Sequence, residues 1–322
     1  MTHLSRSTSF FRPFVLPATL ALALTAPQAA TTAFAQSARQ RMDTTFALER
    51  NAWIDVSAAS GTIIVTGWTR PEARVIARTE NGLIEGVFTA SRIGLTMRHD
   101  RSSSRNRTRT GPAYFEISVP IGTRVMVSTS SGDVRIRGTA AEVQATSSSG
   151  NIEIVDAVDR IVAQTISGDL RLERIRGRTR ISTTSGDLEL DSTTGELEIR
   201  SVSSDMRISR VESSEVRIGT TSGDISYEGM IAPRGTYDIS THSGDVRFEI
   251  PESTGATLSL QTYSGDIESS FPMTLQPGES LQRQRGRRME FSIGSGGARV
   301  AITTFSGDIT ISRGFARTPR ED

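Results

Sequence analysis

One short motif, Ser-Gly-Asp, recurs along most of this chain and constrains its fold more than any other feature. It occurs seven times, and two variants, Ser149-Gly150-Asn151 and Ser203-Ser204-Asp205, continue the series. The central residues lie at 132, 150, 168, 186, 204, 223, 244, 265 and 307, so the steps are 18, 18, 18, 18, 19, 21, 21 and 42 residues. A fixed period in this range is typical of a repeat architecture. The last step is twice 21, which predicts one degenerate coil there.

Each period contains two short runs in which apolar and polar residues alternate. Apolar side chains stand two and four residues after the glycine, as in Leu170 and Leu172, and mostly also seven and five residues before it. Strict alternation over short runs predicts half-buried strands rather than helices. Glycine permits a positive φ between the strands, and the Asp side chain can hydrogen-bond to its own turn. Each period is therefore expected to be strand, Ser-Gly-Asp corner, strand and return turn.

The exposed residue between the two apolar ones indicates how the periods are arranged. In successive periods it is Arg135, Glu153, Arg171, Glu189 and Arg207, and after Ser226 the series resumes with Arg247 and Glu268. In a parallel solenoid, equivalent positions of neighbouring coils lie about 4.8 Å apart, so alternating charges would face each other. The sequence therefore predicts an all-β fold, a parallel β-solenoid with about 18–21 residues per coil. An antiparallel β-roll or sandwich is the alternative.

A second column consists entirely of hydroxyl side chains. It stands three residues before each central position, at Thr129, Ser147, Thr165, Thr183, Ser201, Thr220, Thr241, Thr262 and Thr304. By alternation these side chains point inward. Because buried polar groups are almost always hydrogen-bonded, we expect a stacked ladder that satisfies itself and the corner backbone.

The first 35 residues have the features of a secretory signal peptide. Arg6 and Arg12 precede a short apolar run, and Ala33-Phe34-Ala35 is a small-x-small site that predicts cleavage after Ala35. The run is shorter than the roughly 20 apolar residues of a membrane span. We therefore expect a periplasmic or extracellular protein with no transmembrane span in the mature chain.

The chain divides into four predicted regions. They are a signal peptide at 1–35, an N-terminal β region with the first coils and an arginine-rich loop at 36–130, the Ser-Gly-Asp β-solenoid at 131–313, and a polar C-terminal tail at 314–322. Within the second region, 72–79, 94–100 and 113–120 have the pattern of strands. The degenerate coil at 271–294 is expected to cap an edge of the solenoid.

Composition excludes several kinds of chemistry. The chain has no cysteine, which excludes a disulfide framework, a thiolate metal site and a cysteine nucleophile. It also has no lysine, so all 37 basic residues are arginines and Schiff-base chemistry is excluded. The net charge of +1 becomes −1 without the two arginines of the signal peptide. This balance gives no support to nucleic-acid binding.

Two sets of exposed residues are candidates for binding. The first is a pair of arginine clusters that could contact polyanions, since arginine pairs well with phosphate and carboxylate. The second is a strip of rings in one corner column, immediately before the serine. The clusters contain Arg101, Arg105, Arg107, Arg109, Arg283, Arg285, Arg287 and Arg288, and the strip contains His242, Tyr263 and Phe305.

No catalytic, cofactor or metal site is expected. The Asp residues of the corners could bind calcium, but each corner offers a single carboxylate, and turn capping explains it. A carbohydrate-active enzyme would need paired carboxylates in a cleft, whereas the acidic residues here belong to repeating columns. The three histidines, His3, His99 and His242, do not cluster in the sequence.

The repeats resemble a known family. The Ser-Gly-Asp-apolar-x-apolar units, the opening run at 61–71 and the closing run at 296–309 are similar to a bacterial family of β-strand-repeat domains, labelled putative adhesin and of unknown function. The resemblance covers about 50–313. It implies a repetitive β fold and an envelope or surface location, and it brings no catalytic residues. The chain departs from the pattern at Ser204, where glycine is expected, and around Gly286.

These observations lead to one functional hypothesis and two alternatives. We expect a non-enzymatic secreted or periplasmic protein of the cell envelope, an adhesin-like structural or binding module that presents a repetitive β surface. Its partner would be a surface polysaccharide or another envelope protein. The first alternative is a periplasmic scaffold or stress-response accessory, and the second is a carbohydrate-active β-helix enzyme. The sequence leaves the oligomeric state and the handedness of the solenoid open.

Overall fold

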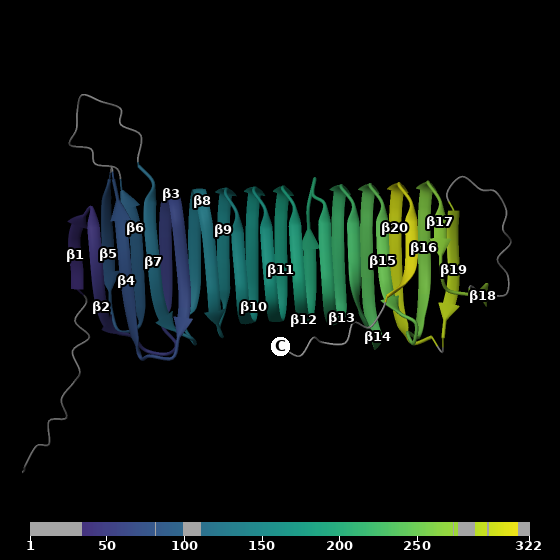
Figure 1. Cartoon of the computed structure of the whole chain (residues 1–322), viewed down its shortest axis with the longest axis horizontal. Helices are drawn as coiled ribbons and strands as arrows, with labels where there is room; N and C mark the ends of the chain where they lie inside the picture. The colour runs from purple at the N-terminus through teal and green to yellow at the C-terminus, as the bar shows by residue number, and fades with distance from the viewer. Residues whose placement is uncertain are drawn as a thin grey trace, which may run out of the picture. The chain divides into compact units, whose positions relative to one another are not determined.

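The computed structural model describes residues 34–80, 82–98, 111–272, 274–275, 287–294 and 296–314. Within these ranges all the regular elements are β-strands (Figure 1). The body is formed by β3 (Trp53–Trp68), β8 (Arg124–Thr139), β9 (Val143–Ser149), β10 (Ile152–Ser167), β11 (Leu170–Ser185), β12 (Leu188–Arg200), β13 (Met206–Ser222), β14 (Ile225–Ser243), β15 (Val246–Pro251), β16 (Ala256–Ser264), β17 (Ile267–Ser269), β20 (Ala298–Ser306) and β21 (Ile309–Gly314). Within the described ranges, no helix has the length and apolar character of a membrane span.

Neighbouring coils of the body pair in parallel and in register. β10 pairs with β11 from Ile152↔Leu170 to Ser167↔Ser185, and β11 pairs with β12 from Leu170↔Leu188 onward. The partners are one period apart, so equivalent residues of successive coils are direct neighbours. Strands β10, β11 and β13 continue through the return turn and end at the Ser-Gly-Asp corner. The predicted parallel β-solenoid is confirmed, and an antiparallel roll or sandwich is wrong for this body.

The return turns also repeat. Asp156, Arg174, Ser192 and Arg210, one in each successive coil, all have a φ between 52° and 57°. This left-handed conformation is uncommon for residues other than glycine. Arg174 donates two hydrogen bonds to the Asp156 carboxylate, from Nε at 2.6 Å and from Nη2 at 3.0 Å. This pair therefore links two consecutive return turns.

One continuous apolar core runs along the body. The inward residues Leu170, Leu172, Leu188 and Leu190 are at most 1% exposed. Larger side chains fill the core further along, where Tyr227 and Phe248 stack with their ring centroids 4.8 Å apart. The alternation of the sequence thus corresponds directly to burial, because successive side chains of a strand point to opposite faces.

The order of coils in space differs from their order in the sequence. The last coil, β20 and β21, pairs with β14 and β15 on one side and with β16 and β17 on the other. Figure 1 shows these yellow strands between green ones that precede them in the chain. The coil of Gly307 therefore lies between those of Gly244 and Gly265, which the linear series of the sequence did not predict.

The predicted degenerate coil at 271–294 is wrong. Its described strands are β18 (Thr274–Leu275) and β19 (Arg287–Ile293), and β19 runs antiparallel to β16, from Ala256↔Ile293 to Thr262↔Arg287. β18 pairs antiparallel with β19. Because the chain reverses direction, it cannot form a coil in the parallel ladder. It covers the outer edge of β16 instead, which agrees with the expected capping role.

Antiparallel strands also cover the N-terminal edge. β6 (Arg92–Arg98) and β7 (Ala113–Pro120) pair in parallel with β3, which continues the solenoid by one rung. Next to β7 lies β4 (Glu72–Thr79), and next to β4 lies β2 (Arg41–Ala47); both pairings are antiparallel. Next to β6 lies β5 (Leu83–Phe88), and next to β5 lies β1 (Phe34–Arg39), again antiparallel. The predicted strands of this region are present, with β6 beginning two residues early. The predicted boundary at residue 130 lies inside β8, and the four-region division stays a prediction.

The corner glycines allow the coils to approach each other. Gly168 has a φ of +146°, and a Cβ on it would lie 2.3 Å from the carbonyl oxygen of Gly150. Such a distance is too short for any side chain, and this backbone region is open only to glycine. At Ser204, which stands where the other corners have glycine, φ is not positive, so the serine does not adopt this strained conformation. Its Oγ accepts a hydrogen bond from Ser201 Oγ at 2.6 Å.

We expect Gly168→Ala to destabilise the solenoid by at least about 2 kcal/mol, because it combines a strained backbone with a clash against the neighbouring coil. The matched control is Gly219→Ala in β13, where a Cβ would lie 3.4 Å from its nearest neighbour and φ is not positive. Urea unfolding followed by circular dichroism should give a clearly lower midpoint for Gly168→Ala than for the control. Equal midpoints would show that the corner does not require glycine.

Candidate binding surfaces at the Ser-Gly-Asp corner

The Asp residues of the corners form a hydrogen-bonded ladder along the solenoid. In seven links, a side-chain oxygen of one corner residue accepts a bond from the backbone N–H of the equivalent residue in the next coil, at 3.2 Å in the first link and at 2.8–3.0 Å in the others. The sequence interpretation, in which each Asp bonds its own turn, is therefore wrong. The acidic ladder consists of Asp133, Asn151, Asp169, Asp187, Asp205, Asp224, Asp245, Asp308 and Asp266 in spatial order.

Two irregular positions show what the ladder requires. Asn151 takes the place of an Asp, and its Oδ1 accepts from Asp169 N at 2.9 Å, so an amide oxygen serves as well as a carboxylate. In the described structure, no ladder bond joins Asp187 to Asp205, the pair beside Ser204, where the corner lacks glycine. The ladder thus depends on a correctly placed oxygen acceptor and on the corner backbone.

A row of alternating charges lies beside the ladder. Arg135 Nε is 3.4 Å from a Glu153 carboxylate oxygen, and Arg171 Nη1 is 2.6 Å from Glu189 Oε2. These contacts confirm the predicted facing of opposite charges. One part of the prediction is wrong, because Thr310 pairs with both Arg247 and Glu268 and so separates them. The reason is the position of the last coil in space.

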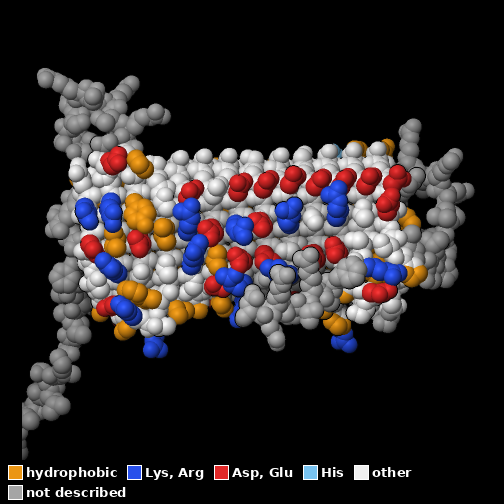
Figure 2. Space-filling model, viewed as in Figure 1, with side chains coloured by type: hydrophobic (Ala, Val, Ile, Leu, Met, Phe, Trp, Pro, Cys, Tyr) orange, Lys and Arg blue, Asp and Glu red, His pale blue; other side chains and the backbone are white. Residues whose placement is uncertain are grey.

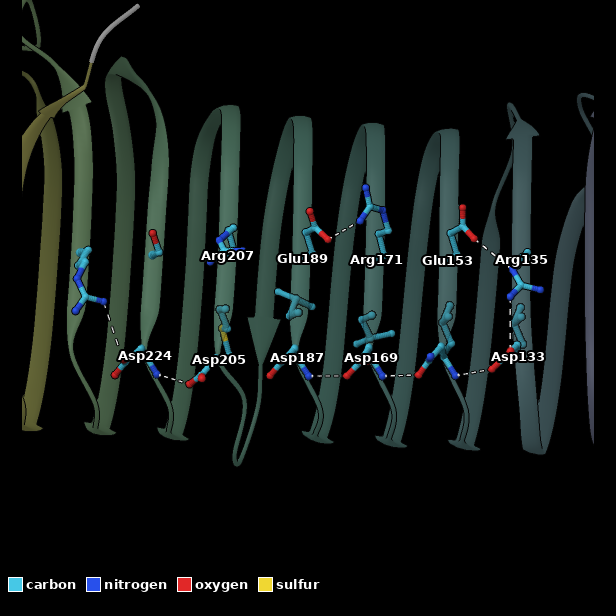
Figure 3. A pocket seen from close by; sticks show the side chains of 18 residues that line it. Asp133, Arg135, Glu153, Asp169, Arg171, Asp187, Glu189, Asp205, Arg207 and Asp224 are labelled. Atoms are coloured by element: carbon cyan, nitrogen blue, oxygen red, sulfur yellow. Dashed lines mark hydrogen bonds and ion pairs between the residues drawn. The ribbon is translucent and has the colours of Figure 1, made fainter. Parts of the chain in front are cut away.

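A shallow groove of about 660 Å³ runs between the acidic ladder and the charged row (Figure 3). Its lining extends from Asp133 to Arg247, across the middle coils of the body. Figure 2 shows the same arrangement on the molecular surface, a line of acidic side chains above a row of mixed charge. The sequence contained both columns, but their common groove was missed because each column was interpreted by itself. No group of three or more potential metal-ligating side chains occurs within the described ranges.

The hydroxyl column lies inside the corner, as predicted. Thr129, Ser147, Thr165 and Thr183, among others, are at most 5% exposed. Some members bond the corner backbone: Thr183 donates to Ser185 O at 3.0 Å. Other members have no hydrogen-bond partner for the side-chain oxygen in the structure, namely Thr129, Ser147, Thr165 and Thr241. The expected hydrogen bonding of this column is therefore only partly present. None of these side chains reaches the groove, and their role is internal.

The three rings of the corner strip are stacked. His242 and Phe305 have centroids 4.7 Å apart with planes 9° from parallel, and Phe305 and Tyr263 are 4.8 Å apart at 4°. Phe305 therefore lies in the middle, which follows from the inserted last coil. Phe305 is 46% exposed and Tyr263 is 52% exposed. The same column contains two further exposed apolar residues that the sequence interpretation did not include, Ile166 at 58% and Val202 at 51%.

Most of the predicted arginine clusters lie outside the described residues. This applies to Arg101, Arg105, Arg107, Arg109, Arg283 and Arg285. Arg287 and Arg288 begin β19, where their backbone pairs with Thr262 and Gln261. Polyanion binding by these arginines stays a prediction.

One carboxylate of the outer face is strongly held by arginines. Glu198 is 9% exposed and contacts Arg180 Nη2 at 2.7 Å and Arg200 Nη2 at 2.6 Å. The hydrogen bond from Arg180, above all, holds the pKa of Glu198 below its usual range, against the opposing effect of burial. Glu198 is therefore fixed in its charged form on the side of the corner away from the groove.

Comparison with known proteins identifies the family of this fold. Residues 114–312 match the profile of Toastrack DUF4097, a family of domains of unknown function. No curated protein matches the chain. A crystal structure described as a putative cell adhesion protein from Clostridium sporogenes is 10% identical, with 85% of this chain and 100% of that chain covered and a TM-score of 0.21. A putative adhesin from Bacteroides fragilis is 13% identical, with 85% and 97% covered and a TM-score of 0.40.

Replacing Asp169 tests the acidic ladder. Asp169→Ala removes the oxygen that accepts from Asp187 N at 3.0 Å and should lower the free energy of unfolding by about 0.5–1.5 kcal/mol. Asp169→Asn keeps an acceptor, as Asn151 does in the native chain, and should stay within about 0.5 kcal/mol of the wild type. Urea midpoints measure both. If the two variants are equally destabilised, the charge of the ladder matters more than its hydrogen bonds.

Glu198 should make the stability dependent on pH. Its folded-state pKa is lowered, so its contribution is present above the unfolded-state value of about 4.3 and is lost as the pH falls through the folded value. Glu198→Gln should therefore cost about 1–2 kcal/mol at pH 7, and the gap to the wild type should close on acidification. Glu189→Gln, whose side chain is 47% exposed, is the control and should cost under about 1 kcal/mol. A gap for Glu198→Gln that is constant from pH 7 to pH 3 would contradict the ion-pair role.

Proposed function

This chain belongs to the Toastrack DUF4097 family, and we propose that it is a non-enzymatic, adhesin-like module of the cell envelope, secreted or periplasmic. It presents a repetitive β surface to an extended partner, such as a surface polysaccharide or another envelope protein. The family is defined by a domain of unknown function, so the proposal rests on the chain itself.

The observation that carries the proposal is the constant register of the exposed columns. The corner residues of successive coils are backbone neighbours, as in Ser131↔Ser149, Ser149↔Ser167 and Ser167↔Ser185. Equivalent side chains are thus repeated about every 4.8 Å along the stack. A partner with its own linear repeat can contact many coils at once, and the weak individual contacts then add as avidity.

The carboxylates with shifted pKa values lack the property that a glycosidase acid needs. Asp43, Asp156 and Glu198 have shifted pKa values, and an arginine lowers each of them. A glycosidase needs an acid whose pKa is raised, so that it can protonate the leaving oxygen. These three carboxylates instead stay ionised and join neighbouring strands or turns.

The proposed location rests on the signal-peptide features of 1–35. The family match begins at residue 114 and does not include this segment. Strand β1 spans Phe34–Arg39, so cleavage after Ala35 would leave Gln36–Arg39 of that strand in the mature chain.

Location and binding can be tested in one experiment. We expect the exported protein to begin at Gln36 in N-terminal sequencing, to fractionate with the periplasm or the medium, and to bind intact cells or isolated envelope polymers. The control is the chain without 1–35, which should remain in the cytoplasm. Export without binding to any surface or envelope polymer would favour the scaffold or stress-accessory alternative. Turnover of a polysaccharide that one carboxylate substitution abolishes would favour the enzyme.

A further inference from the structure

The rings of the corner strip are offset and expose parts of their faces. Two parallel rings in contact are separated by about 3.5–4.0 Å between their carbons. The measured centroid separations of 4.7 Å and 4.8 Å at angles of 9° and 4° are larger, so each ring is displaced sideways over the next. Phe305 and Tyr263 remain about half exposed in this arrangement. The strip therefore offers apolar π surface to solvent along the direction of coil stacking.

Hydrogen-bonding side chains accompany the rings. Ser240, Thr303 and Gln261 lie two residues before His242, Phe305 and Tyr263, and they are exposed on the same face of their strands. Their backbones are aligned, since Ser240 pairs with Thr303 and Thr303 with Gln261. Each of three consecutive coils thus presents one ring and one hydroxyl or amide group.

Carboxylates stand at the corner beside the rings. Asp245, Asp308 and Asp266 stand three residues after the rings, on the far side of the Ser-Gly corner. Asp308 N and Asp266 N bond the carboxylates of Asp245 and Asp308 at 2.9 Å and 2.8 Å, which fixes these two side chains in place. Asp245 also contacts Arg247 Nη2 at 3.7 Å, so the repulsion of an anionic partner on the strip comes from Asp308, which stands beside the middle ring.

We propose that the corner strip binds an extended, uncharged polysaccharide of β-linked pyranose rings, which lies along the stack with about one sugar per coil. This inference deepens the proposed function and rests on it. The C–H face of a pyranose packs on the negatively charged face of an aromatic ring, and its hydroxyls suit the row of Ser240, Thr303 and Gln261. The ring spacing of 4.7–4.8 Å is comparable to the length of one sugar in an extended chain.

The column continues past the rings with exposed apolar groups. Ile166 and Val202 precede His242 in the same column, and Thr184 and Thr221 alternate with them. Backbone pairing carries the alignment across these coils. A long polymer can therefore be followed from Ile166 to Tyr263, with the rings as the strongest contacts at one end.

Two polymers with the same β-linked glucan backbone provide the test. Native affinity electrophoresis of the purified protein should show retardation in hydroxyethyl cellulose, which is uncharged, and at least tenfold weaker retardation in carboxymethyl cellulose. The double variant Phe305→Ala/Tyr263→Ala should raise the dissociation constant for hydroxyethyl cellulose at least tenfold. Met230→Ala, which changes an apolar residue that is 53% exposed elsewhere, should change it less than twofold.

A second variant protects the test against misfolding. Phe305→Leu keeps an apolar side chain but removes the π face, and it should weaken binding nearly as much as Phe305→Ala while circular dichroism stays unchanged. Unaltered binding by the double variant, preference for carboxymethyl cellulose, or no retardation of the wild type would overturn the inference. Self-association that Phe305→Ala abolishes would assign the strip to a second copy and would also overturn it.

The outcomes also separate this inference from the proposed function. If the wild type binds cells or envelope material and the double variant binds them equally well, the strip is not the polysaccharide site, but the binding role remains. If the wild type binds neither cells nor envelope polymers, the proposed function itself fails.

Discussion

The close stacking of backbones at the Ser-Gly-Asp corner determines the rest of this structure. At Gly150, Gly168 and Gly186 a Cβ would lie 2.2–2.3 Å from the carbonyl oxygen of the neighbouring corner, so the coils meet there without side chains between them. This contact fixes the register of each coil against the next. Once the register is fixed, every position of the period becomes a straight column, inward or outward. The core, the hydroxyl column, the acidic ladder and the corner strip are all consequences of that one constraint.

The acidic ladder shows how the stack tolerates like charges at close spacing. Two carboxylates about 5 Å apart in water repel each other by on the order of 1 kcal/mol. A hydrogen bond from a backbone N–H to a charged acceptor contributes about 1.5–3 kcal/mol, which offsets that repulsion. Asn151 makes the same bond without a charge, so the fold itself needs only the acceptor. The carboxylates at the other positions add a negative line to the surface that the fold does not require.

The sequence predicts the coil geometry well and the connections between coils poorly. Periodicity and charge alternation predict the parallel solenoid, the inward hydroxyls and the facing of Arg171 and Glu189. They cannot predict that the last coil lies before that of Gly265, because all corners share one motif and one apolar pattern. In the structure, β19 runs antiparallel along the outer edge of β16, and the last coil pairs with the other edge. The groove was missed for a related reason, since it arises only when two columns are considered together in space.

The hydrogen bonds that hold the carboxylates of the acidic ladder in place also affect which partners the corner strip can recognise. A surface carboxylate normally can turn away from an approaching anion, which weakens its effect. Asp245 and Asp308 cannot do so without breaking their bonds to the neighbouring N–H groups. Asp245 also contacts Arg247, so it is the Asp308 carboxylate beside Phe305 whose negative charge is held in place by the backbone register. A ring stack next to such a charge discriminates by charge as well as by shape, and a neutral polymer with a repeat close to the coil spacing satisfies both conditions.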